Sequence, residues 1–190
     1  MAFTETGFPG LLVFEPTVFR DDRGYFFESF NSKAFEEKGI IRNFVQDNQA
    51  FSSYGILRGL HYQLNPYAQA KLVRVILGEV LDVVADLREG SPTFGKHYSI
   101  LLSEENNKQL YVPRGFAHGY SVLSKTALFF YKCDNFYNKG AESGIMYNDS
   151  SLNIDWRIPA DKAILSEKDN LNKSFTDASK NFIFNSENPF

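Results

Sequence analysis

Short runs of β-branched, aliphatic and aromatic residues recur along this chain, with only a few residues between one run and the next. The runs span residues 11–15, 25–30, 43–51, 56–63, 70–77, 80–87, 97–102, 109–112, 116–123 and 126–134. Residues of these types favour pleated, half-buried strands, and such close spacing leaves little room for intervening helices. The pattern therefore predicts an all-β fold, an antiparallel sandwich or barrel rather than a parallel sheet with crossover helices.

Turn signals and capping residues predict how some of these runs are connected. The segment 21–24 reads Asp-Asp-Arg-Gly and predicts a turn between the first two runs. Gly78 and Glu79 predict a tight hairpin between the runs at 70–77 and 80–87. In the second of these runs one face is entirely aliphatic, while the other carries the two acids Asp82 and Asp86, and this alternation predicts a half-buried strand. A helix is expected at 32–38, capped by Ser32 and closed by Gly39, and another short helix at 161–169.

Length, charge and cysteine content narrow the class of protein. A chain of 190 residues is predicted to form one domain, 1–190, with residues 174–190 as a tail that carries four phenylalanines. The net charge of −3 gives no general attraction to nucleic acid or to an anionic membrane. Cys133 is the only cysteine, so no internal disulfide is expected. The N-terminal residues do not resemble a signal peptide and no apolar run reaches bilayer length, so we expect a cytoplasmic protein.

Two neighbouring strand-like runs place proton-active side chains beside apolar ones. Lys71 shares its strand face with Val73 and Val75, and His61 points to one face of its own run. An ammonium group on an apolar face must be paired, hydrated or ready for an anion, because burying it alone is very unfavourable. Arg58 has the opposite parity to His61, so both reach one cavity only if the strand bulges at Gly59.

Two further positions extend this cluster. The segment 113–119 has the spacing Pro-x-Gly-x-x-His, which places His118 just inside a strand and facing inward. Tyr131 lies on another strand, with Phe129 and Cys133 on its face. Histidine and tyrosine can serve as general base and general acid, although each is also common as a hydrogen-bonded core residue.

A carboxylate is expected to orient a basic histidine. Sequence alone leaves five candidates open, namely Asp82, Asp86, Asp134, Asp155 and Asp169. A metal is disfavoured, because Gln63 stands where a second histidine of a barrel metal site would be needed and Lys71 where a carboxylate would follow. We therefore expect no metal and no cofactor.

Several motifs together resemble the dTDP-4-dehydrorhamnose 3,5-epimerase family. They lie at residues 22–28 (DRGYFFE), 46–48 (QDN), 57–63 (LRGLHYQ), 71–75 (KLVRV), 90–95 (GSPTFG), 113–119 (PRGFAHG), 131–133 (YKC) and 165–169 (LSEKD). The similarity runs from about Phe8 to Asp169. It implies a cupin-type double-stranded β-helix, or jelly-roll barrel, with a few short helices. It also implies a metal-free homodimer of the dTDP-L-rhamnose pathway.

The resemblance also implies roles for individual residues. It implies that His61 is the base, Asp169 its carboxylate partner, Tyr131 the acid and Lys71 a group at the reacting sugar. It implies substrate binding by a larger set: Arg23, Glu28, Gln46, Asn48, Arg58, His118, Tyr137, Glu142 and Lys168. Within this set, Tyr137 resembles the residue that stacks on thymine.

The expected reaction inverts carbons 3 and 5 of dTDP-4-dehydro-6-deoxy-D-glucose by proton removal and return beside the 4-keto group. Its product would be dTDP-4-dehydro-L-rhamnose. Two alternatives stay open at this point. One is an enzyme that inverts a single centre of a related 4-keto sugar nucleotide. The other is a non-catalytic barrel that binds a nucleotide sugar and requires neither His61 nor Tyr131 for affinity.

Overall fold

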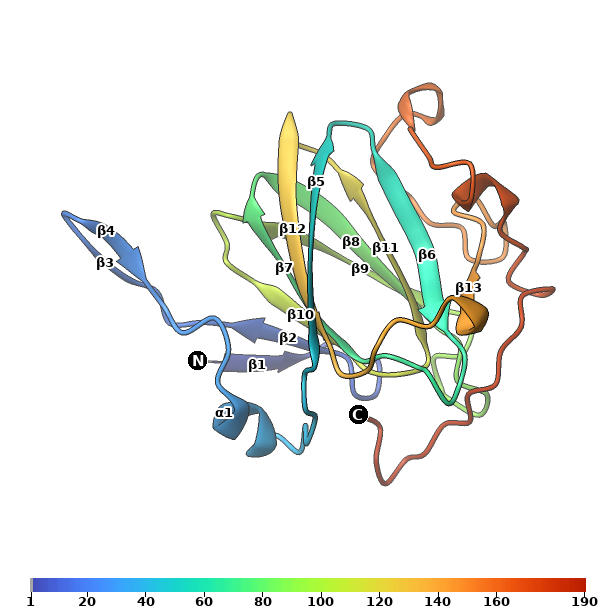
Figure 1. Ribbon diagram of the computed structural model, residues 1–190, viewed down its shortest axis with the longest axis horizontal. Coiled ribbons are helices and arrows are strands. Elements are labelled where there is room, and N and C mark those ends of the chain that lie inside the picture. The colour runs from blue at the N-terminus through green and yellow to red at the C-terminus, as the bar shows by residue number, and fades with distance from the viewer. Residues whose placement is uncertain (1) are drawn as a thin grey trace.

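The computed structural model describes residues 2–190, which form two packed antiparallel sheets and a projecting hairpin (Figure 1). The first sheet has the order β1 (Ala2–Glu5), β2 (Leu12–Glu15), β10 (Gln109–Val112), β7 (Lys71–Leu77), β12 (Thr126–Cys133), β5 (Gln46–Ser53). The second has the order β13 (Glu142–Gly144), β6 (Leu57–Gln63), β11 (Phe116–Val122), β8 (Glu79–Asp86), β9 (His97–Ser103). The hairpin pairs β3 (Phe19–Asp21) with β4 (Gly24–Phe26). The expected jelly-roll barrel of cupin type is confirmed.

The main core lies between the two sheets, where aliphatic residues of β2, β7 and β10 meet those of β8, β9 and β11. A second apolar cluster covers the outer face of the five-stranded sheet and joins Trp156 and Phe182 to the aliphatic residues of β8. This second cluster overturns the prediction that β8 is half-buried, because its aliphatic face lies under the C-terminal segments. Alternation in the sequence cannot show that a distant segment will cover the outer face.

The predicted hairpin at Gly78 is wrong. β7 pairs with β10 and β12, whereas β8 pairs with β11 and β9, so the chain passes from one sheet to the other at this point. Gly78 has φ of +79°, and a Cβ there would lie 2.1 Å from the carbonyl oxygen of Thr126. Glycine therefore fits a tight corner between sheets as well as a hairpin turn.

The helix predictions are only partly correct. Helix α1 (Ser32–Glu36) is present, but Asn31 rather than Ser32 is its N-cap, accepting a hydrogen bond from the Lys33 amide. No α-helix forms at 161–169. Two short 3₁₀ turns occur instead, η2 (Ala160–Lys162) and η3 (Asp169–Leu171), with a third, η1 (Lys139–Ala141), earlier in the chain. Ile164 pairs with Ile56 in an isolated parallel bridge, and this tertiary pairing holds the segment between the turns extended.

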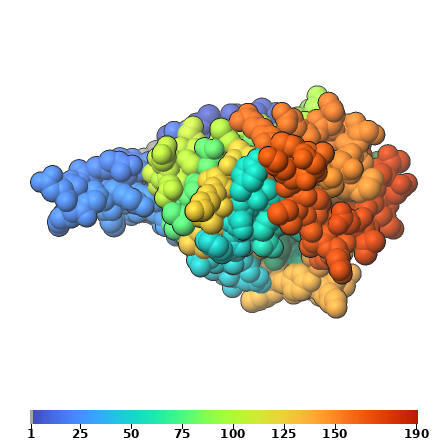
Figure 2. All heavy atoms as spheres, turned by 90° about the horizontal axis from the view of Figure 1, so that it is seen from above, coloured from blue at the N-terminus to red at the C-terminus, as the bar shows by residue number. Residues whose placement is uncertain are grey.

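The C-terminal tail packs on the body of the protein, and its four phenylalanines all make contacts there. Phe175 packs on Phe94, Phe182 on Tyr62 and Phe190 on Tyr111, while the Arg88 guanidinium lies over Phe184. Figure 2 shows these late segments spread over one side of the molecule. No helix among residues 2–190 is long and apolar enough to cross a membrane.

A buried ion pair fixes the loop after β8. Arg88 donates to both carboxylate oxygens of Asp86, at 2.9 and 2.8 Å, and the hydroxyls of Ser91 and Thr93 donate to the same carboxylate. Asp86 is completely buried and Arg88 is 4% exposed. Burial would raise the pKa of Asp86, but Arg88 and the hydroxyls together lower it.

Replacing Asp86 by alanine is expected to lower the free energy of unfolding by roughly 3–5 kcal/mol, because Arg88 would be left buried without its partner. Because the folded pKa of Asp86 is lowered, its contribution is present above the unfolded carboxyl pKa and is lost as the pH falls. Denaturant unfolding measures both effects. Asp21→Ala, which removes an exposed ion pair with Arg23, should leave the midpoint unchanged, and equal effects of the two variants would contradict this account.

Candidate active site

A cavity of about 160 Å³ opens between the two sheets. Its lining comes from five strands, which contribute Ala50 (β5), Arg58 and His61 (β6), Lys71 (β7), His118, Gly119 and Tyr120 (β11), and Phe129 and Tyr131 (β12). The proton-active residues that the sequence places on strands therefore all line one cavity, namely His61, Lys71, His118 and Tyr131. Neither Lys71 nor Tyr131 is directed into bulk water.

A bulge in β6 allows Arg58 and His61 to line the same cavity. His61 pairs with His118 and Arg58 pairs with Tyr120, so three steps on β6 match two on β11. Gly59, with φ of +123°, takes up the extra residue. A Cβ there would lie 2.5 Å from the Gly119 Cα atom, so no other residue fits without a shift of backbone. The bulge expected at Gly59 is confirmed.

His61 forms a pair with the carboxylate of Asp169, which belongs to η3 near the end of the chain. Asp169 is 3% exposed and also accepts a hydrogen bond of 2.9 Å from the Ser166 hydroxyl. Burial would raise the pKa of Asp169, but the contacts with His61, Ser166 and Lys168 lower it. An ionised Asp169 accepts the Nε2–H of His61, which leaves Nδ1 unprotonated and able to act as a base.

A second imidazole and carboxylate pair lies deeper. His118 Nε2 is 2.9 Å from Asp82 Oδ2, and both side chains are buried. Asp82 Oδ1 has no hydrogen-bond partner. Burial raises the pKa of Asp82, an effect opposed by His118 and Lys71. Asp82 was one of five open candidates for the partner of a histidine, and the structure pairs it with His118 rather than with His61.

Lys71 and Tyr131 lie next to each other on β7 and β12. The Lys71 ammonium is 5.7 Å from the centre of the Tyr131 ring. Burial lowers the pKa of Lys71, an effect opposed by Cys133, Asp82 and Glu142. Burial, reinforced by Cys133, raises the pKa of Tyr131 to about 12. The phenol is therefore protonated at neutral pH and can donate a proton, while the amine can offer a positive charge to a developing oxyanion.

A polar group borders one end of the barrel near this cavity. The Tyr137 hydroxyl donates to Glu142 at 2.7 Å, and Lys168 forms an ion pair with the same carboxylate. Burial would raise the pKa of Glu142, but Lys168 and Tyr137 lower it. Gln46 donates to Asn48 at 3.0 Å and accepts from the Tyr137 amide at 3.1 Å. This interaction brings the loop after β12 over the start of β5.

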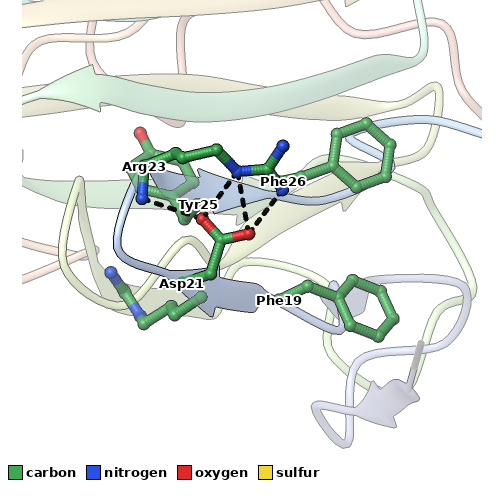
Figure 3. Close-up of a pocket in the computed structure, with 6 residues that line it drawn as sticks. Phe19, Asp21, Arg23, Tyr25 and Phe26 are labelled. Carbon is green, nitrogen blue, oxygen red and sulfur yellow. Dashed lines mark hydrogen bonds and ion pairs between the residues drawn. The ribbon is translucent and has the colours of Figure 1, made fainter.

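Two predicted site residues lie elsewhere. Arg23 is in the β3–β4 hairpin, where its exposed side chain pairs with Asp21 (Figure 3), and Glu28 is an exposed residue just after β4. The hairpin extends away from the body (Figures 1 and 2). The other eleven predicted residues lie at the cavity or among the polar group and the pairs described above.

Sequence reasoning missed several residues that shape the site. Ala50, Tyr120 and Phe129 border the cavity, and strand parity could have found the last two, because Tyr120 shares the face of His118 and Phe129 shares that of Tyr131. Gln63 holds the loop after β12, because its amide accepts from the Asn138 backbone at 2.6 Å and donates to the Phe136 carbonyl. Within the described residues 2–190, no group of three or more His, Cys, Asp and Glu side chains could hold a metal ion.

Comparisons with known proteins agree with this geometry. The family described as dTDP-4-dehydrorhamnose 3,5-epimerase matches residues 5–177. The dTDP-4-dehydrorhamnose 3,5-epimerase of Shigella flexneri is 54% identical over 94% of this chain and 98% of that protein. The crystal structure of the enzyme of that name from Elizabethkingia anophelis has a TM-score of 0.90 and 57% identity, covering 93% and 97% of the two chains.

A third relative was solved with a sugar nucleotide. The dTDP-6-deoxy-D-glucose-3,5-epimerase of Legionella pneumophila, in complex with dTDP-4-keto-L-rhamnose, has a TM-score of 0.88 and 46% identity, covering 92% of this chain and 93% of that one. Matches of this extent in sequence and in structure go well beyond a shared barrel. The chain belongs to the dTDP-4-dehydrorhamnose 3,5-epimerase family.

Proposed function

We propose that this protein inverts carbons 3 and 5 of dTDP-4-dehydro-6-deoxy-D-glucose, giving dTDP-4-dehydro-L-rhamnose. The observation that carries the proposal is the convergence of His61, Lys71 and Tyr131 on one cavity between the sheets. The names and the bound sugar nucleotide of the relatives support the same substrate.

The 4-keto group of this substrate acidifies the hydrogens on both neighbouring carbons. His61, oriented by Asp169, removes one of these hydrogens as a proton and leaves an enolate. The negative charge collects on the oxygen at carbon 4, where the Lys71 ammonium stabilises it. Tyr131 then returns a proton to the opposite face of the carbon, which inverts that centre. His61 then passes the abstracted proton to solvent and Tyr131 regains a proton from solvent, so the same sequence at the second carbon completes the reaction.

Binding of the nucleotide is assigned to the polar group at the end of the barrel. Tyr137 is 54% exposed and offers a flat ring for stacking on thymine, while Lys168 supplies positive charge for the diphosphate. Gln46 and Asn48 add amide groups beside it. Arg58 and His118 lie within the cavity and are assigned to the sugar. Placing this charge locally explains how a protein with a net charge of −3 binds an anion.

The hairpin supports a homodimer as the active form. Phe19, Tyr25 and Phe26 are 62%, 56% and 67% exposed on a ribbon that projects from the body (Figures 2 and 3). These residues line an open hollow of about 540 Å³. Large exposed apolar groups of this kind mark an interaction surface. We propose that the hairpin packs on a second copy of the chain and carries Arg23 and Glu28 to that copy's nucleotide site.

Introducing aspartate at both Phe19 and Phe26 is expected to give a monomer and to raise KM for the sugar nucleotide at least about tenfold. A loss of roughly 1.4 kcal/mol of binding free energy is enough for a tenfold loss of affinity. Sedimentation and steady-state kinetics measure the two effects. Ile183→Asp, which places one such negative charge at an exposed site on the tail, should leave both unchanged. A double variant that stays dimeric with wild-type KM would contradict this role for the hairpin.

Solvent exchange tests the proposed reaction. When the protein acts on dTDP-4-dehydro-6-deoxy-D-glucose in D₂O, deuterium is expected at both carbon 3 and carbon 5, before and after dialysis against EDTA. Proton NMR locates the label and the product configuration. Exchange at one carbon alone would identify a single-centre epimerase, and no exchange by folded protein would reject the proposal in favour of a binding barrel.

A further inference from the structure

One polar atom on the cavity wall has no well-formed hydrogen bond within the protein. Tyr120 lies on β11 with 4% of its surface exposed, and its hydroxyl, although near Ser52 and Arg58, makes no hydrogen bond of good geometry. The ring stacks on Phe129, with centres 4.2 Å apart and planes at 14°. The phenol is thus held in place beside the cavity rather than free to turn toward solvent.

A buried hydroxyl without a partner is unfavourable, and such groups are rare in folded proteins. They are understandable where a ligand supplies the missing hydrogen bond. Tyr120 meets this condition because it lines the cavity. Tyr111 provides the contrast, since its hydroxyl is equally buried and unpartnered but lies in the apolar cluster beside α1 and does not line this cavity.

The strand registers place Tyr120 at the end of the cavity away from the nucleotide residues. On one sheet, Gln46 pairs with Cys133, Asn48 with Tyr131 and Ala50 with Phe129. On the other sheet, Gln63 pairs with Glu142, His61 with His118 and Arg58 with Tyr120. Along both sheets, therefore, the pairs follow the same order: first the residues assigned to the nucleotide, then the reacting groups, and last the pair at the end of the cavity that Tyr120 lines. The stacking of Tyr120 on Phe129 joins the two sheets at that end.

The chemistry of the substrate limits what can reach this end. The diphosphate is attached at carbon 1 of the sugar, so carbon 4 and its substituted neighbours lie farthest from the nucleotide. The ring oxygen on carbon 5 is also bonded to carbon 1 and so lies on the side of the diphosphate. Three other groups are available around carbon 4: the oxygen on carbon 4, the methyl group on carbon 5 and the hydroxyl on carbon 3. The first is matched by the charge of Lys71, and the methyl group forms no hydrogen bond. The hydroxyl on carbon 3 therefore remains as the partner for a phenol.

We propose that the Tyr120 hydroxyl binds the hydroxyl on carbon 3 of the sugar and makes the enzyme selective for 3-hydroxy over 3-deoxy substrates. The inference rests on the proposed function. A neutral phenol can both donate to and accept from a sugar hydroxyl. Burial raises the pKa of Tyr120, an effect opposed by Ser52 and Arg58, so the phenol keeps its proton at neutral pH. A site built to bond a hydroxyl discriminates against the analogue that lacks it.

The test compares two substrates with two variants. Exchange at carbon 5 is measured in D₂O with the 3-hydroxy substrate and with its 3-deoxy analogue, because both carry this hydrogen. For the wild-type protein, kcat/KM is expected to be about 10–100-fold higher with the 3-hydroxy substrate. Tyr120→Phe should lower that ratio to within about twofold of unity by reducing only the 3-hydroxy value. Tyr111→Phe, the matched control, should keep the wild-type ratio.

The ratio does not depend on the fraction of folded protein, so a loss of stability in Tyr120→Phe would not obscure the result. A ratio unchanged by Tyr120→Phe, or equal losses with both substrates, would overturn the role of Tyr120 while leaving the proposed reaction intact. A wild-type protein that exchanges neither substrate would instead reject the proposed reaction.

Discussion

Replacing His61 by asparagine is expected to lower kcat by about 10²–10⁴-fold, the range that a positioned general base supplies. Asparagine keeps an amide that can donate to Asp169, so the cavity should retain its shape. Nucleotide affinity should change little, because the stacking and charged groups, Tyr137 and Lys168, lie outside the cavity lining. Steady-state kinetics and titration with dTDP separate the two quantities.

His97→Asn is the control for this substitution. His97 begins β9 and is not among the residues that line the cavity, so the control should keep wild-type activity. Loss of dTDP affinity in parallel with kcat would show that His61 supports the fold or binding rather than chemistry. Retention of wild-type turnover would show that His61 is not the base.

Replacing Lys71 by methionine is expected to lower kcat by about 10²–10³-fold, as removal of one preorganised oxyanion donor does elsewhere. Methionine nearly preserves the volume but removes the charge, so the enolate would form without stabilisation. Thermal melting should show that the fold survives. Lys132→Met, one residue beyond Tyr131 and paired outside the cavity with Asp47, should keep wild-type kcat. A Lys71 variant with wild-type kcat would contradict its role at the oxyanion.

The pH dependence of the wild-type protein checks the same role. Because burial lowers the pKa of Lys71, its amine loses its proton at a lower pH than a solvated lysine. Activity is therefore expected to decline on the alkaline side at a pH where Tyr131, with a pKa raised to about 12, is still protonated. The Lys71→Met variant should lack this decline. Its persistence in the variant would assign the decline to another group.

The cavity residues were predictable from the sequence because their strands are regular. Parity alone placed Lys71 and Tyr131 on inward faces, and both line the cavity. Arg58 has the opposite parity to His61, so its place in the cavity is predictable only if the strand bulges between them. Glycine in a strand signals such a bulge, and the bulge occurs at Gly59. In these strands, local pattern and tertiary position agree.

The remaining features depend on contacts between distant segments. Sequence reasoning from the residues could not choose the partner of His61 among five aspartates, because Asp169 reaches it from 108 residues away. The corner at Gly78 reads like a hairpin because both require a tight turn with a positive φ. The outer face of β8 looked exposed because its cover, including Trp156 and Phe182, comes from segments much later in the chain.

Inversion requires His61 and Tyr131 to act on opposite faces of the same carbon. Tyr131→Phe in D₂O tests this most directly, with deuterium incorporation and inversion measured in one NMR experiment. His61 should still remove a proton and return a deuteron to the same face, so the account predicts that exchange at carbons 3 and 5 continues while inverted product falls by about 10²–10⁴-fold. Inversion at the wild-type rate, or equal losses of exchange and inversion, would contradict it.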